Sequence, residues 1–149
     1  MNLKNYTSTV PAINSIGRIQ QSLVEAGATD ISMKYDQATK TCTAITFRIV
    51  TNEMPCFFQL PAKIDPCFKV LYAEIKRPQP DTKKRTMDQA ERTAWKIISD
   101  WVEIQLSMIK LEQAEPLQIF LPYVYDPATE KTFFEQLKET KFKGLPNSK

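Results

Sequence analysis

One long helix constrains the fold of this sequence more than any other feature. Between Met87 and Leu111, apolar residues recur at alternating intervals of four and three, which is the period of one helix face. They are Ala90, Ala94, Ile97, Trp101, Ile104, Met108 and Leu111. Trp95, Ile98, Val102, Leu106 and Ile109 widen the apolar arc to about 200° and leave a polar strip of Arg92, Lys96, Ser99, Glu103, Ser107 and Lys110. Because such a helix faces water on one side only, we expect it to be packed by neighbours at the centre of a folded domain.

The sequence before the long helix predicts one helix, three strands and a second helix. The first helix is expected from Pro11, which suits a first turn, to Gly27, which suits a helix C-terminus. Alternating apolar residues then predict strands at 31–35, 45–49 and 56–60. Their short connections require antiparallel pairing, so the strands form a meander with one buried face. The pair Asp65–Pro66 begins the second helix.

The sequence after the long helix predicts an irregular segment and one more helix. The run 117–125 is apolar, but Pro122 interrupts it, so we expect a turn and an extended stretch. Asp126–Pro127 begins a helix on which Phe133, Phe134 and Leu137 dock, and 140–149 is a frayed tail. The whole chain, 1–149, is therefore expected to be a single α+β domain. It has an N-terminal helix, a three-stranded antiparallel meander, a long central helix packed on the sheet and an additional C-terminal helix.

Composition argues against several classes of function. The chain has no histidine, which removes Ser-His and Cys-His nucleophile pairs and imidazole metal sites. Its three glycines are far apart, so no phosphate-binding glycine loop can form. We therefore predict no catalytic residues, no metal and no cofactor, and we favour a non-enzymatic protein. An enzyme that uses only carboxylates, Lys, Tyr or Ser remains open.

Cysteine usage and hydropathy indicate the compartment. Cys42, Cys56 and Cys67 are odd in number and lie in apolar runs, which is typical of reduced core cysteines. No apolar run is long enough to cross a bilayer, and the N-terminal residues lack the apolar segment of a signal peptide. We expect a cytoplasmic protein that does not enter a membrane.

Charge is segregated along the chain although the net charge is only +3. Residues 76–86 are predicted to be an exposed basic connector that contains Lys76, Arg77, Lys83, Lys84 and Arg85. Thr86 and Gln89 suit a capping box at the start of the long helix. Cations beside free N–H groups of a helix N-terminus can bind phosphate, so these five residues are candidate nucleic-acid-binding residues. The alternative interpretation is a solvated loop whose charge serves solubility.

A second hypothesis is an interaction with another protein. Trp95 lies at the flank of the apolar arc, where contact with the core or with another helix is the main interpretation and a second subunit or a stacked base is the alternative. Trp101 is expected in the core. The segment 103–139 is mainly acidic and offers a surface for a protein partner. The long helix also offers a face for oligomer formation. In this interpretation the chain is an interaction module or an inhibitor of a host protein.

A resemblance adds a biological context. The segment QAERTAWKIISDWVEIQL, followed by IFLPYV, resembles a family of small uncharacterised proteins of bacteriophages, prophages and integrative elements. The N-terminal NYTSTV and the helix after it are similar to the start of that family. The resemblance implies an accessory protein of a mobile element and assigns no activity and no functional residues. Nucleic-acid binding and protein interaction both stay open as its function.

Overall fold

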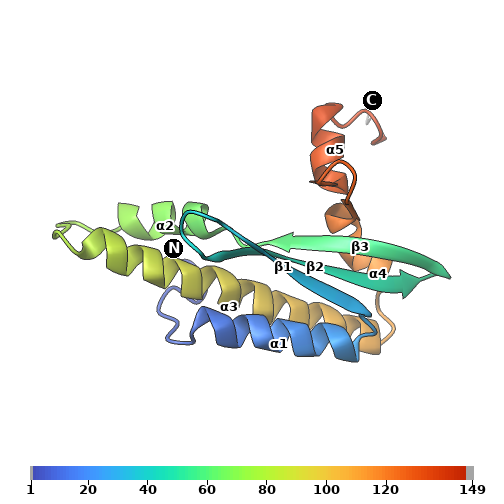
Figure 1. Ribbon diagram of the computed structural model, residues 1–149, viewed down its shortest axis with the longest axis horizontal. Helices are drawn as coiled ribbons and strands as arrows, with labels where there is room; N and C mark the ends of the chain where they lie inside the picture. The colour runs from blue at the N-terminus through green and yellow to red at the C-terminus, as the bar shows by residue number, and fades with distance from the viewer. Residues whose placement is uncertain (1, 147–149) are drawn as a thin grey trace.

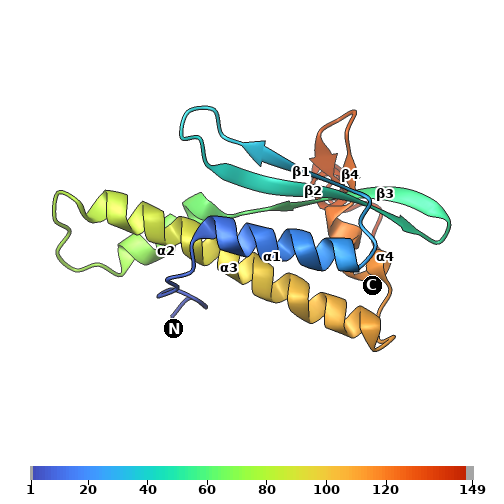
Figure 2. The ribbon, with the colours of Figure 1, turned by 60° about the horizontal axis from the view of Figure 1, so that its bottom comes forward.

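A three-stranded antiparallel sheet lies over two helices in the computed structural model, which describes residues 2–146 (Figure 1). The elements are α1 (Ala12–Glu25), β1 (Asp30–Tyr35), β2 (Cys42–Thr51), β3 (Met54–Pro61), α2 (Ile64–Ala73), α3 (Thr82–Lys110), α4 (Pro116–Phe120), a 3-10 turn η1 (Leu121–Tyr123), β4 (Tyr125–Asp126), β5 (Lys131–Thr132) and α5 (Phe133–Glu139). Helices α1 and α3 run side by side beneath the sheet, and α2 lies along the N-terminal half of α3 (Figure 2). The predicted α+β fold with its meander and long central helix is confirmed.

The strand register explains why one sheet face is buried. Phe47 of β2 pairs with Ile31 of β1 on one side and with Phe58 of β3 on the other. Since side chains alternate along a strand, residues two positions away share this face. Ile45 and Leu60 accordingly pair and are almost fully buried. The alternation in the sequence therefore identified the core-facing residues of β2 and β3.

Helix α1 ends as its glycine predicts. The helix stops at Glu25, and Gly27 adopts a φ of 104°, in the left-handed region that favours glycine. The amide of Ala28 then donates to the carbonyl of Leu23 at 2.9 Å, which satisfies a free carbonyl of the last turn. The chain leaves the helix at once and enters β1, which keeps α1 against the sheet.

Helix α3 begins earlier than predicted, at Thr82 instead of Met87. The predicted capping box is wrong because Thr86 is buried inside the helix, and the N-cap residue is Asp81. The prolines at 78 and 80 end the irregular loop, and the Lys and Arg residues that follow are good helix formers. The basic residues that we assigned to the connector are therefore partly helical.

Part of the polar strip of α3 is covered by α1 and by the N-terminal segment, whereas Ser107 and Lys110 face water. Ser99 of α3 and Ser15 of α1 are both buried, and the hydroxyl groups of both have no hydrogen-bond partner within the described residues. Such small side chains let two helix backbones approach closely. On the same side of α3, Arg18 of α1 forms an ion pair with Glu103 at 3.1 Å. The Glu103 part of the strip therefore contacts a polar side chain of α1.

The N-terminal segment is bound to α3 by hydrogen bonds between residues far apart in the sequence. The side-chain amide of Asn5 donates to the Asp100 carboxylate at 2.9 Å, and the Asn5 backbone carbonyl accepts from the hydroxyl of Thr93 at 2.9 Å. Farther along, the Ser8 carbonyl accepts from Gln89 at 3.0 Å and from Arg92 at 3.2 Å. These long-range hydrogen bonds hold the segment across the helix.

The core is completed by a residue that the sequence did not single out. Phe120, at the end of α4, is fully buried and lies edge-on to Phe47, with ring centroids 5.3 Å apart. It also contacts Phe58 and Trp101 at centroid distances of 5.6 and 5.8 Å. The apolar run after Pro116 therefore forms a short helix that closes the core, and only its later part is extended.

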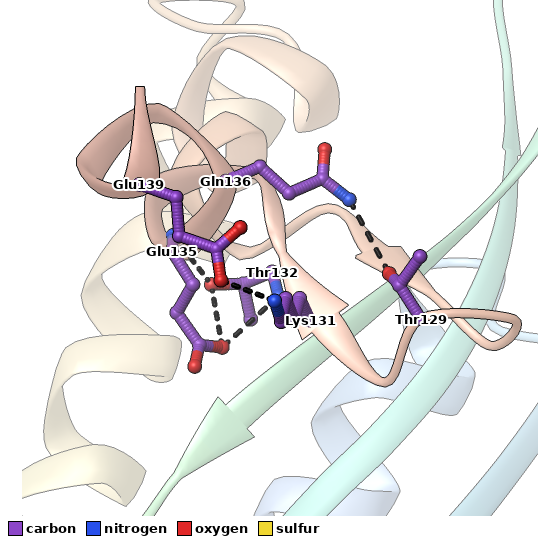
Figure 3. A network of polar contacts seen from close by, with 6 residues as sticks. All are labelled: Thr129, Lys131, Thr132, Glu135, Gln136 and Glu139. Atoms are coloured by element: carbon purple, nitrogen blue, oxygen red, sulfur yellow. Dashed lines mark hydrogen bonds and ion pairs between the residues drawn. The ribbon is translucent and has the colours of Figure 1, made fainter. Parts of the chain in front are cut away.

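The C-terminal part differs from the prediction. Asp126 and Pro127 do not begin a helix, because Asp126 lies in β4, which pairs with β5 as a small hairpin. Helix α5 starts at Phe133 after a capping box between Thr132 and Glu135, in which the Glu135 amide donates to the Thr132 hydroxyl at 3.3 Å (Figure 3). An ion pair between Lys131 and Glu139 ties the hairpin to the helix. Phe133 and Phe134 dock less than expected, since they are 37% and 42% exposed.

Candidate nucleic-acid interface

The five predicted basic residues lie at one end of the molecule, around the start of α3. Lys76 and Arg77 are in the loop after α2, and Lys83, Lys84 and Arg85 occupy the first turn of α3. All five are exposed. We call this set the basic tip. Figure 1 shows the loop projecting beyond the sheet and far from α5. A surface that projects in this way can reach a large charged partner without a clash from the rest of the domain.

Two of these residues are brought together. Arg77 from the loop and Arg85 from α3 line one hollow of about 340 Å³. The remaining lining residues are Leu71, Ile75, Gln79, Thr82, Thr86 and Gln89. Within this loop the amide N–H of Gln79 donates to the hydroxyl of Thr82 at 2.7 Å, which fixes the loop against the helix start. The two guanidinium-bearing residues therefore share a hollow whose walls are partly apolar, with Leu71 and Ile75 beside polar side chains.

The other three residues do not share that hollow. Consecutive residues of a helix point about 100° apart, so Lys83, Lys84 and Arg85 spread over roughly 200° of the helix surface. Lys76 is exposed in the loop and does not line the hollow either. The basic tip is thus a rounded cationic end with one concave site, and it is not a single flat basic face.

The electrostatics of the basic tip favour an anion. Between Lys76 and Arg85 the only acidic residue is Asp81, which forms an ion pair with Arg85 at 3.1 Å. Both side chains of this pair are about 70% exposed, so solvent screens it and it contributes little to stability. The Asp81 side chain accepts no hydrogen bond from a backbone N–H of the first turn of α3, so these helix N–H groups lack a side-chain cap. The positive end of the helix dipole adds to the cationic field.

The predicted interaction residue Trp95 has no exposed surface. Its side chain is 0% exposed, and its indole N–H donates to the carbonyl of Cys42 at 3.2 Å. The prediction that it presents a flank to a partner is therefore wrong: the sheet covers that side of α3. Trp101, which we expected in the centre of the core, is only half-buried and lies against Phe120 and Tyr123. Trp95 therefore lies inside the core, and Trp101 packs at its margin.

A second polar hollow lies beside Glu91. It has a volume of about 480 Å³. Residues of the β1–β2 hairpin, of the start of α2 and of α3 line it, among them Lys34, Asp36, Lys63 and Asp65. Burial raises the pKa of the Glu91 carboxyl, the negative charge of Asp88 raises it further, and Arg92 opposes both. Sequence reasoning gave Glu91 no role, because its burial depends on the hairpin that folds over it.

The part of the chain that the structure describes contains no group of side chains that would bind a metal. In residues 2–146 no three His, Cys, Asp or Glu side chains are grouped closely enough to bind an ion. The three cysteines are free and buried, and burial raises the pKa of the Cys42 and Cys67 thiols. No helix of this part of the chain is both long and apolar enough to cross a membrane.

The comparisons with known proteins give no family. No protein-family model matches the chain, and the searches of curated proteins and of solved structures find no significant match.

Proposed function

We propose that this protein binds the phosphate backbone of a nucleic acid through the basic tip. The observation that supports this proposal is the pair Arg77 and Arg85, which come from different elements and line one hollow at an uncapped helix start. A guanidinium group can donate two parallel hydrogen bonds to a phosphate. Helix N–H groups and the helix dipole favour the same anion.

The arrangement of the lysines suits a polymer better than a small anion. Lys83 and Lys84 point away from the hollow on other sides of the helix, so they would contact phosphates at a distance from the one held there. A phosphate would compete with Asp81 for Arg85, and that exposed ion pair is weak enough to be displaced. Phosphate contacts carry no base information, so the binding would be largely independent of sequence.

A charge-matched pair of variants tests the proposal. Changing Lys83, Lys84 and Arg85 to Ala removes three cations and keeps good helix formers in the first turn. The control changes three exposed lysines near the C-terminus, Lys138, Lys141 and Lys143, to Ala. Binding to single- and double-stranded DNA and RNA is measured by fluorescence anisotropy over a range of salt concentrations. The first variant should flatten the slope of log affinity against log salt by about 2–3, at about 0.7–0.9 for each lost phosphate contact.

Three results would reject the proposal. The first is no wild-type binding to any of these nucleic acids at low salt. The second is a salt slope that does not change in the basic-tip variant. The third is an equal loss in the control variant, which would mean that net charge alone determines binding.

The alternative function is a protein-interaction module. It is favoured by two exposed apolar side chains, Ile104 of α3 and Leu111 directly after it. The resemblance to proteins of bacteriophages, prophages and integrative elements supports either function as that of a mobile-element accessory protein acting in the cytoplasm. Identifying the genes beside its own would test that context.

A further inference from the structure

The hollow that Arg77 and Arg85 line, which we call the arginine hollow, is larger than one phosphate group needs. Its volume is about 340 Å³. A water molecule occupies about 30 Å³ in the liquid, and a phosphate group is only a few times larger. Sites that hold whole small molecules begin at roughly 300 Å³. A phosphate bound by the two guanidinium groups therefore leaves most of the hollow to the rest of its ligand.

The walls of the arginine hollow differ between its two sides. On the side of α2 they are apolar: Leu71 lies in the last turn of the helix and Ile75 in the loop directly after it. On the side of α3 they include Thr82 and Thr86, which share one helix face because they are four residues apart. A ligand that fills the hollow thus meets an apolar surface from α2 and hydroxyl groups from α3.

Thr86 has a hydroxyl group that the fold leaves unused. The residue lines the hollow and is only 7% exposed. The Thr82 hydroxyl accepts from the amide N–H of Gln79, but the Thr86 hydroxyl makes no hydrogen bond to the residues that the structure describes. The fully enclosed hydroxyl groups without a partner are those of Ser15 and Ser99, so the Thr86 hydroxyl is accessible from the hollow. Since a buried polar group without a partner costs free energy, this hydroxyl indicates a polar ligand in the hollow.

We propose that the arginine hollow holds one complete nucleotide of a single-stranded nucleic acid, a proposal that rests on the proposed function. Arg77 and Arg85 bind the phosphate of this nucleotide, and Thr86 donates a hydrogen bond to a phosphate oxygen. The base lies against Leu71 and Ile75, as bases held by proteins stack on apolar side chains. The hollow then determines which form of nucleic acid the basic tip prefers.

A base reaches the apolar wall only when it is not part of a duplex. In a duplex its faces are covered by the neighbouring bases and its edge is paired, so turning it out costs free energy. In a single strand the bases can turn toward a protein surface without that cost. The exposed Lys83 and Lys84 contact phosphates in either form, because phosphate contacts carry no base information. Any effect of the bases on affinity therefore comes from the hollow.

An abasic strand separates the base contact from the phosphate contacts. The probes are a single-stranded DNA oligonucleotide, an abasic strand of the same length and the same oligonucleotide as a duplex, each measured by fluorescence anisotropy at low salt. The abasic strand keeps every phosphate and loses every base. The wild type should bind it about three- to tenfold more weakly than the intact single strand, because the apolar contact is lost.

Two substitutions assign these contacts to the hollow. Ile75→Ser should remove the preference for the intact strand over the abasic strand, lower the ratio of single-strand to duplex affinity and leave the salt slope unchanged. Val70→Ser is the matched control, because Val70 on α2 is 45% exposed and does not line the hollow. Thr86→Val keeps the branched shape and removes the hydroxyl, so it should weaken binding to both single strands about tenfold. It should not lower the melting temperature, since that hydroxyl has no partner among the described residues.

Equal wild-type affinity for the intact and the abasic strand would overturn this proposal and leave the proposed function standing, since phosphate contacts alone would then explain the binding. An Ile75→Ser variant that discriminates the two strands as Val70→Ser does would overturn it too, because the base would then lie elsewhere. Wild-type affinity of Thr86→Val would refute the placement of the phosphate in the hollow. No binding to any of the probes at low salt would reject this proposal together with the proposed function.

Discussion

Replacing the two tryptophans of α3 with Ala should have unequal effects on stability. Trp95 is fully buried and its indole N–H donates to the Cys42 carbonyl, so Trp95→Ala loses a large apolar side chain and a buried hydrogen bond. Truncating a buried Trp costs about 3–5 kcal/mol, and we expect the upper end, about 4–5 kcal/mol. Trp101 is half-buried, so Trp101→Ala should cost only about half as much, ~2–3 kcal/mol. A typical domain is stable by only ~5–15 kcal/mol, so the first variant should be close to unfolding.

The comparison is best made by urea denaturation followed by circular dichroism, because either change removes a fluorescent probe. Trp95→Phe separates the two contributions: it keeps most of the apolar volume, loses the indole donor and should cost about 1–3 kcal/mol. The control is Ile13→Ala on α1, where the side chain is 75% exposed and the change should stay within about 0.5 kcal/mol. Equal losses for the two Ala variants, or a larger loss for Trp101→Ala, would refute our description of which face of α3 contacts the sheet.

Two further predictions concern pH. The folded state raises the pKa of Glu91, so its protonated carboxyl favours folding and stability is lost as pH rises through the folded-state pKa. Glu91→Gln should therefore raise the melting temperature at neutral pH. The difference between variant and wild type should vanish below the ordinary pKa of 4.5. Burial acts to raise the pKa of Asp100, but hydrogen bonds from Lys96 and Asn5 hold it below its ordinary value of 3.8. The Asp100 carboxylate therefore stabilises the fold above that pH, and this stabilisation is lost as pH falls through the folded-state pKa. Asp100→Asn should lower the melting temperature at neutral pH and increase proteolysis of residues 2–10. A variant in which these residues are cleaved as slowly as in the wild type would show that Asn5 is held by Thr93 alone.

Local patterns were sufficient for the elements up to α3 and for the pairing of β1, β2 and β3, but not for the elements after α3. The three-four spacing identified α3, and the alternation around Ile45 and Phe58 identified the buried strand face, because each period is a direct consequence of backbone geometry. Short connections then left antiparallel pairing as the only choice. The start of α3 was missed because Lys, Arg and Thr are as common in a loop as in a helix turn. Together with the prolines before them, these residues indicated a loop, so the helix start was placed several residues too late.

The candidate site was only partly accessible from the sequence. The cluster of cations around Lys83 could be read directly, since it needs no folding to be counted. That Arg77 and Arg85 share a hollow could not, because it depends on how the loop after α2 returns to the helix. Likewise, nothing in the sequence indicated that the β1–β2 hairpin and Glu91 line the same hollow.

By itself, the sequence determined that α3 needs neighbours on most of its circumference, because apolar side chains avoid water whatever their partner is. Only the tertiary structure decided which neighbour takes which side. Hydrophobicity is not directional, so the pattern could not assign the sheet to Trp95 and leave Trp101 at the margin. The pattern also could not show that Ser99 faces another helix while Ile104 faces solvent. Contact between helices depends on how small and how well fitted the side chains are, as well as on how apolar they are.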